Sequence, residues 1–169
     1  MPSDVETKAE KNTEMAPKLK DGALKIVAMC GKSSKEFDTA NKVSWECSDL
    51  VKETREEAKK ATDPKAKKDL ETKLKNAEAQ FKKFIAGRTR IADALVDAAA
   101  TGGNLLRSIN ELVKSNDALL KALPRAACEG DPRAIAAMIK KSSAEVEAVI
   151  PKLEKAVEGA KGLPKAPTI

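Results

Sequence analysis

The residues best suited to chemistry in this sequence are three cysteines, Cys30, Cys47 and Cys128. A catalytic cysteine needs a neighbouring base to deprotonate it, and histidine is the usual one. The chain has no histidine and no tyrosine, so the commonest general base and the commonest metal ligand are both missing. No two cysteines have the spacing of metal ligands. We therefore predict no catalytic residue, no metal site and no cofactor, and we do not expect an enzyme.

The same cysteines also argue against a disulfide framework, because their number is odd. A helix spanning Cys30 and Cys47 would hold the two residues about 25 Å apart, far beyond bridging distance. We predict unpaired, buried thiols in a reducing compartment. No N-terminal stretch resembles a signal peptide, and no run of about 18 apolar residues is present to cross a bilayer. A cytoplasmic location is therefore expected.

Two other patterns carry weaker chemical signals. Gly102-Gly103 lacks both the glycine-rich loop and the following Lys-Ser or Lys-Thr that would cradle a phosphate. We interpret this pair as a helix boundary, with close helix packing as the alternative. Glu53, Glu56 and Glu57 lie among Lys and Arg on polar faces, so we interpret them as solvated charge and not as metal ligands.

Positive charge is the one unevenly distributed feature. Between Val51 and Arg90 there are 13 Lys or Arg against 7 Asp or Glu, and this excess equals the net charge of +6 for the whole chain. Lys68, Lys75 and Lys82, which we call the lysine stripe, recur every seven residues opposite an apolar seam. The candidate surface for an anionic partner consists of Lys68, Lys75, Lys82, Lys83, Arg88 and Arg90.

F-actin and an anionic lipid surface are the partners that such a surface would suit. A solvated helix face without a partner is the alternative interpretation. Nucleic acid is disfavoured, because no aromatic side chains are interleaved with the charges to stack on bases. Trp45, the sole tryptophan, lies at the edge of the apolar face and is interpreted as a core or boundary anchor.

The elements that must position these residues are amphipathic helices. Apolar residues recur at steps of three and four in four segments, and aromatic residues make up only 2% of the chain, so no sheet is expected. The segments start at Pro17, Pro64, Asn104 and Pro132. Asp63-Pro64 and Asp131-Pro132 each supply a capping side chain followed by proline at the first helical position.

Glycine and proline residues define where these helices end or bend. Gly102-Gly103 is expected to end the second helix, Pro124 to stop the third and Pro151 to kink the fourth. Gly31 falls within the first helix at a cost of about 1 kcal/mol relative to alanine. A break there would make five helices, although the apolar seam keeps its phase across Gly31 and favours a continuous helix.

Four long amphipathic helices joined by short polar turns predict an all-α fold, an antiparallel up-and-down bundle. We expect a single bundle domain over residues 17–160, with frayed segments at 1–16 and 161–169.

The stretch ATDPKAKKDLETKLKNAEAQF, residues 61–81, resembles the start of a talin-rod helix, and residues 130–150 are similar in style. With the alanine-rich seams and scarce aromatics, about two thirds of the chain resembles bundles of the talin rod and vinculin type. The resemblance implies cytoskeletal adaptor work through partner helices, F-actin or acidic phospholipids. A vinculin-binding helix, the basic-aromatic arm of vinculin and the actin-binding signature of talin's C-terminal module are not found.

The leading functional hypothesis is a non-enzymatic helical-bundle interaction or adaptor protein of the cytoskeleton that binds F-actin or an amphipathic helix. A membrane-surface bundle, or a bundle that carries an apolar ligand, is the alternative. Homo-oligomerisation through an uncovered seam also stays open.

Overall fold

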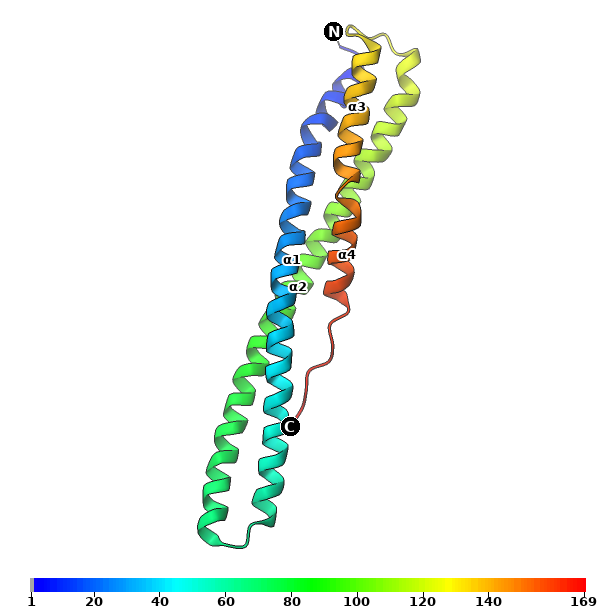
Figure 1. The fold of residues 1–169 in the computed structure, drawn as a ribbon. Helices are drawn as coiled ribbons and strands as arrows, with labels where there is room; N and C mark the ends of the chain where they lie inside the picture. Colours follow the sequence, from blue (N-terminus) through cyan, green and yellow to red (C-terminus); the bar gives the residue numbers. More distant parts are fainter. Residues whose placement is uncertain (1) are drawn as a thin grey trace. The chain divides into compact units, whose positions relative to one another are not determined.

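The computed structural model describes residues 2–169, and no strand occurs among them. The elements in chain order are α1 (Asp4–Lys60), α2 (Pro64–Ala122), the short 3-10 helix η1 (Leu123–Arg125), α3 (Pro132–Glu147) and α4 (Ile150–Lys161) (Figure 1). The predicted all-α class is confirmed. The predicted count of four or five long helices is not matched, because the chain forms three long helical segments: α1, α2 and the broken segment α3–α4.

The prediction that Gly102-Gly103 ends a helix is wrong, since both residues lie inside α2. A Cβ atom on Gly102 would lie 2.7 Å from Val157 Cγ2, 3.3 Å from Ile26 Cγ2 and 3.4 Å from Leu153 Cδ1. At Gly103 the added Cβ would have no heavy atom within 4 Å apart from its chain neighbours and the backbone of its own helix. Gly102 therefore lets α2 approach both α1 and α4 closely, and this packing role outweighs the low helix propensity of glycine.

The first helix begins at Asp4, 13 residues before Pro17, where the sequence predicted its start. Residues 4–16, expected to be frayed, belong to α1, and Pro17 lies inside the helix. Ser3 Oγ accepts a hydrogen bond from the Glu6 amide at 3.3 Å, while Glu6 Oε2 accepts one from the Ser3 amide at 2.7 Å. This reciprocal pair is a capping box, which satisfies two amides of the first turn. Ala9 is fully buried one turn later, so packing holds this segment as well.

Both predicted Asp-Pro helix starts are confirmed. Asp63 Oδ2 accepts a hydrogen bond from the Ala66 amide at 3.2 Å, and Asp131 Oδ1 accepts one from the Arg133 amide at 3.0 Å. In each case a proline follows, where its missing amide leaves no donor unsatisfied.

The predicted effects of Gly31, Pro124 and Pro151 also agree with the structure. α1 continues through Gly31 without a break. α2 ends at Ala122, and Pro124 lies in η1. α3 ends at Glu147 and α4 begins at Ile150. Because Pro151 has no amide to donate to the Glu147 carbonyl, the helical hydrogen-bond pattern is interrupted at this point.

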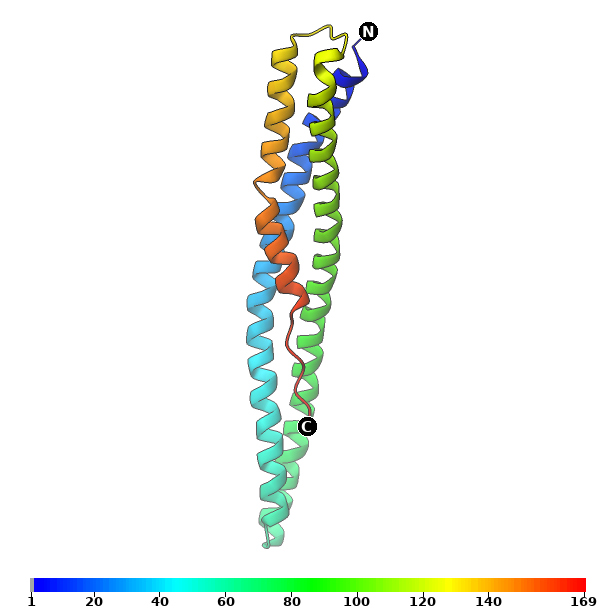
Figure 2. The same ribbon diagram turned by 90° about the vertical axis from the view of Figure 1, so that its right-hand side faces the viewer.

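The described residues form two compact units. Unit 1 contains the chain up to Gly31 together with Asp97–Lys161, and unit 2 contains Lys32–Val96 together with Gly162–Ile169. In unit 1, parts of α1 and α2 lie beside α3 and α4 as three neighbouring helical segments (Figures 1 and 2). In unit 2, two helical segments are accompanied by an extended segment, Gly162–Ile169 (Figure 2).

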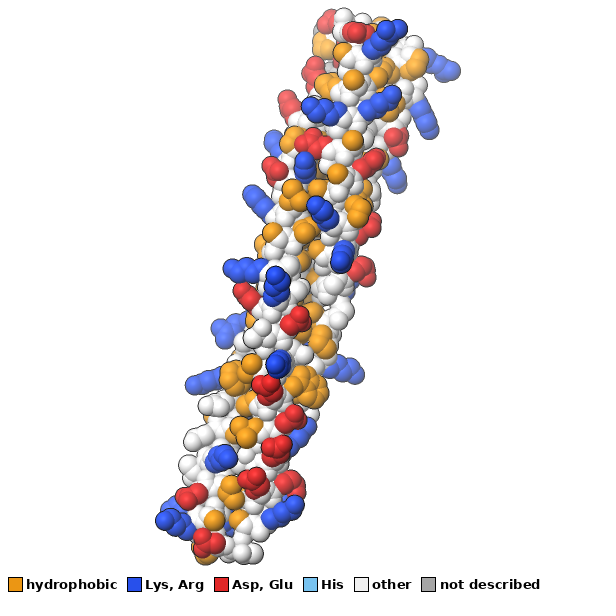
Figure 3. Space-filling view, in the orientation of Figure 1, with side chains coloured by type: hydrophobic (Ala, Val, Ile, Leu, Met, Phe, Trp, Pro, Cys, Tyr) orange, Lys and Arg blue, Asp and Glu red, His pale blue; other side chains and the backbone are white. Residues whose placement is uncertain are grey.

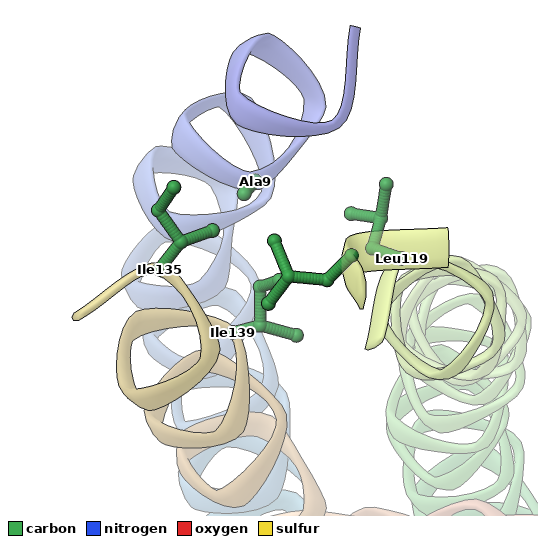
Figure 4. Packing of buried hydrophobic residues seen from close by; sticks show 5 residues of the cluster. Ala9, Leu119, Ile135 and Ile139 are labelled. Carbon is green, nitrogen blue, oxygen red and sulfur yellow. The ribbon is translucent and has the colours of Figure 1, made fainter. Parts of the chain in front are cut away.

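The core of unit 1 is built from aliphatic side chains of all three helical segments. One cluster joins Ala9 of α1, Leu119 of α2 and Ile139 of α3, whose side chains converge between the helices (Figure 4). Leu153 and Val157 of α4 are also buried. Burying a side chain of this size contributes roughly 1.5–3 kcal/mol, so the three-to-four spacing of these residues accounts for the association of the helices.

A buried polar layer crosses this core at Asn116 of α2, which has no exposed surface. Its Nδ2 donates to Ser142 Oγ at 2.8 Å and to Ser143 Oγ at 2.9 Å on α3. Its Oδ1 accepts from Asn12 Nδ2 of α1 at 2.9 Å. The layer therefore links all three helical segments of unit 1 through hydrogen bonds that depend on their alignment.

The core of unit 2 is smaller and lies between the two helical segments. Cys47 and Val51 of α1 pack against Ala77 and Phe81 of α2. Cys47 Sγ donates to the Ala77 carbonyl oxygen at 3.6 Å. Large apolar residues are exposed in both units: Met15, Leu24 and Met29 in unit 1, and Trp45, Leu50, Phe84 and Val96 in unit 2.

Candidate functional site

The lysine stripe lies on the exposed surface of α2 in unit 2. Lys68, Lys75 and Lys82 are all exposed, and none forms an ion pair with any of residues 2–169. Their seven-residue spacing places them within about 40° of one another around the helix axis. Lys83 and Arg90 are also exposed. The ammonium groups of the stripe are thus free to meet an anionic partner.

Arg88, which we predicted to extend this surface, is instead buried, with only 6% of its surface exposed. Its Nε donates to Asn41 Oδ1 at 2.9 Å, and its Nη2 donates to the Pro164 carbonyl oxygen at 2.5 Å. The guanidinium carbon lies 4.7 Å from the centroid of the Phe37 ring, a cation–π contact. No carboxylate in the described part of the chain forms an ion pair with Arg88.

The segment Gly162–Ile169, expected to be frayed, lies along unit 2 as an extended chain (Figure 2). Besides the bond from Arg88 to Pro164, Ser48 Oγ donates to the Thr168 carbonyl oxygen at 2.7 Å. Pro167, between these two anchors, is buried. The segment is therefore seated on the helices by main-chain hydrogen bonds and by its second proline.

A second apolar seam runs along unit 2 outside its core. It consists of Val43 and Leu50 on α1 and of Phe84 and Ile91 on α2, each pair seven residues apart. Leu50 and Phe84 are each 40% exposed, and Val43 and Ile91 are half-buried. We call these four residues the outer seam.

The outer seam lies on one side of the two-helix unit. Leu50 precedes the buried Val51 by one residue, which places it about −100° from Val51 around the axis of α1. Phe84 follows the buried Phe81 by three residues, which places it about −60° from Phe81 around the axis of α2. In antiparallel helices, rotations of the same sense point to the same side. Ser48, two residues before Leu50, lies about 160° around the axis, so the extended segment occupies the opposite side.

Trp45 is 44% exposed, so it is a boundary residue and not part of the core. The face shown in Figure 3 carries acidic and basic side chains interspersed with small apolar patches. Such mixed charge is typical of a solvated helix face.

The prediction of unpaired, buried thiols is confirmed for Cys30 and Cys47, whereas the burial predicted for Cys128 is wrong. Cys30 and Cys47 are buried, Cys128 is partly exposed, and all three are free. Burial raises the pKa of the Cys30 and Cys47 thiols, which makes them poor nucleophiles. Within residues 2–169, no group of three or more Cys, Asp or Glu side chains comes together that could hold a metal ion.

Unit 1 carries an open groove between α1 and α3. It is lined by Pro17 of α1 and by Met138, Lys141 and Glu145 of α3, with further small and polar residues beside them. The groove is open to solvent and its walls include charged side chains, so it does not enclose an apolar ligand on all sides.

Comparisons with protein-family models, curated proteins and solved structures gave no match for this chain. None of the helices in the described range has the length and apolar content that crossing a membrane requires.

Proposed function

We propose that this protein is a non-enzymatic interaction or adaptor protein whose unit 2 binds an amphipathic helix of a partner along the outer seam. The observation that carries this proposal is the seven-residue spacing of partly exposed apolar residues on both helices of the unit. Helices pack against each other through such repeats, because side chains at this spacing form a continuous stripe along a helix.

Covering the exposed area of the outer seam would stabilise the bound state. Leu50 and Phe84 each leave 40% of their surface exposed in a unit that has only two helices. A third helix placed over the seam would remove this apolar surface from water, at roughly 25 cal/mol per Å². Unit 1 illustrates the arrangement at Ile109, Leu112 and Ile139, each of which has 4% or less of its surface exposed, although Leu24 of the same unit remains 37% exposed.

The experiment compares capture of partners by the parent chain and by a Leu50→Gln/Phe84→Gln variant. Glutamine is a good helix former, so the helices should persist while the apolar stripe is lost. Trp45→Gln is the matched control, because Trp45 is similarly exposed but lies about 140° from Leu50 around the axis of α1. We expect captured proteins to be lost only with the double variant, and to be displaced by a synthetic copy of their own amphipathic helix.

Equal capture by the double variant would rule out the outer seam as the binding surface. Sedimentation analysis of the purified chain covers one further outcome. If the parent self-associates and the double variant does not, the seam binds a second copy of the chain and not a different partner.

The lysine stripe supports a second candidate function, binding to F-actin or to an anionic lipid surface. The supporting observation is that all three ammonium groups are exposed and without ion pairs in residues 2–169. Parallel cosedimentation with F-actin and with anionic vesicles tests it. Binding that falls steeply above about 0.15 M salt would indicate an electrostatic surface of this kind.

A further inference from the structure

The side of unit 2 opposite the outer seam carries a site that holds an extended peptide. Its occupant in the structure is the chain's own segment Gly162–Ile169, which contains Pro164-Lys165-Ala166-Pro167. Proline fixes its own φ near −65° and also pushes the preceding residue towards an extended conformation. Leu163 to Pro167 is therefore largely preorganised before it reaches the helices, which lowers the entropy lost on binding.

The groups that hold this segment recognise its main chain. Arg88 donates to the Pro164 carbonyl oxygen and Ser48 donates to the Thr168 carbonyl oxygen, four residues further on. Pro167 is buried between these two anchors. Two hydrogen bonds to its main chain and one buried proline define a pattern that does not depend on most of the side chains of the segment.

Two side chains of α1 position Arg88 in this site. It is buried, it has no carboxylate partner in the described residues, and its guanidinium is positioned by Asn41 and by the Phe37 ring. A buried cation is costly unless its donors are satisfied, and here the Pro164 carbonyl satisfies one of them. Asn41 and Phe37 therefore hold Arg88 ready for a carbonyl acceptor.

We infer that the surface formed by Phe37, Asn41, Ser48 and Arg88, which we call the peptide surface, is a binding site for an extended Pro-x-x-Pro segment of a partner protein, with Gly162–Ile169 as the resident competitor. A tethered competitor acts at an effective concentration in the millimolar range, so a partner must displace it or bind when it is released. This inference concerns a different side of unit 2 from the outer seam and does not rest on helix binding.

The test uses the full chain and a synthetic peptide, GLPKAPTI, with the sequence of residues 162–169. In a Pro164→Ala/Pro167→Ala chain the resident segment should leave the peptide surface, and NMR relaxation should show that its backbone amides have become mobile. The peptide should then bind this chain and change the fluorescence of Trp45, which lies one helical turn from Ser48. The parent chain should bind the same peptide more weakly, by about tenfold or more, because its own segment competes.

Three controls decide the result. A peptide with both prolines replaced by alanine should bind at least about tenfold more weakly, since it loses its preorganisation and its buried ring. Arg88→Met should abolish binding, whereas Arg90→Met, an exposed arginine on the same helix, should not. Arg88→Met removes a buried group and can disturb the fold, so Ser48→Ala provides a milder variant. Ser48→Ala should weaken peptide binding while its circular dichroism spectrum remains as helical as that of the parent chain.

The inference is overturned if the peptide does not bind the Pro164→Ala/Pro167→Ala chain, or if the proline-free peptide binds equally well. It is also overturned if residues 162–169 of the parent chain are already mobile. A dimer of the parent chain that dissociates in the proline variant would identify the occupant as the segment of a second copy, and would likewise exclude a different partner protein.

Discussion

Substituting the two neighbouring glycines of α2 tests how closely the helices of unit 1 pack. Gly102→Ala places a methyl group 2.7 Å from Val157 Cγ2, a distance that carbon atoms do not tolerate. Gly103→Ala places the same group where no atom lies within 4 Å apart from its chain neighbours and the backbone of its own helix. Through helix propensity alone, each substitution should raise the free energy of unfolding by about 1 kcal/mol, because alanine restricts the unfolded chain and favours helix.

The difference between the two variants isolates the packing cost. Val157 is buried, so its methyl group cannot turn away freely, and overpacking of this kind typically costs 1–3 kcal/mol. We expect Gly102→Ala to unfold with a free energy about 1–3 kcal/mol lower than Gly103→Ala, which itself should be up to about 1 kcal/mol more stable than the parent.

Urea denaturation followed by far-UV circular dichroism measures both free energies of unfolding. If the free energy falls with urea concentration at the same slope in both variants, the unfolded state is unaffected. Adding Val157→Ala to Gly102→Ala should recover part of the loss, which a double-mutant cycle would report as a favourable coupling. If the two glycine variants were equally stable, α2 would not approach α4 as closely as the structure shows, and the explanation for the uninterrupted helix would fail.

Three further predictions address the thiols, a buried carboxylate and the lysine stripe. Under native conditions a thiol reagent should label the partly exposed Cys128 first, and Cys30 and Cys47 only on unfolding; rapid labelling of either buried thiol would contradict the assigned seam. Hydrogen bonds from the Gly130 and Ser3 amides lower the pKa of Glu6 from 4.5 to about 2, so its stabilisation is complete above about pH 4.5 and is lost as the pH falls through about 2. Denaturation at several pH values should therefore show a steeper acid loss for the parent than for Glu6→Gln, and parallel curves would argue against the bond to Gly130. Reversing the lysine stripe to glutamate should change stability by less than about 0.5 kcal/mol per site but weaken any binding to F-actin or anionic vesicles; unchanged binding would exclude the stripe.

Much of the helical architecture was predictable, because its signals are local. The Asp63-Pro64 and Asp131-Pro132 starts depend on side chains within three residues, and Pro151 breaks the helix through its own missing amide. The capping box that starts α1 is equally local, since Ser3 and Glu6 have the required spacing, and that signal was available in the sequence.

The remaining features depend on tertiary neighbours. Gly102 continues a helix because Val157, more than 50 residues away, packs against it. Arg88 is buried because Asn41 and Pro164 receive its hydrogen bonds, and the spacing of charges along α2 gives no indication of those partners. Five of the six residues of the candidate anionic surface are exposed on α2, and the sixth, Arg88, belongs to a different site.

The hydrogen-bonded layer around Asn116 restricts how the helices of unit 1 can slide along one another. A purely aliphatic interface tolerates displacement by one helical turn, since leucine and isoleucine side chains find new neighbours of similar shape. Sliding α3 along α2 by one helical turn would instead carry Ser142 and Ser143 about 5 Å away from Asn116 and leave a buried amide without acceptors. Replacing Asn116 with leucine should therefore yield helices that associate in more than one alignment, visible as extra signals for the same residue in an NMR spectrum, even where the unfolding temperature rises.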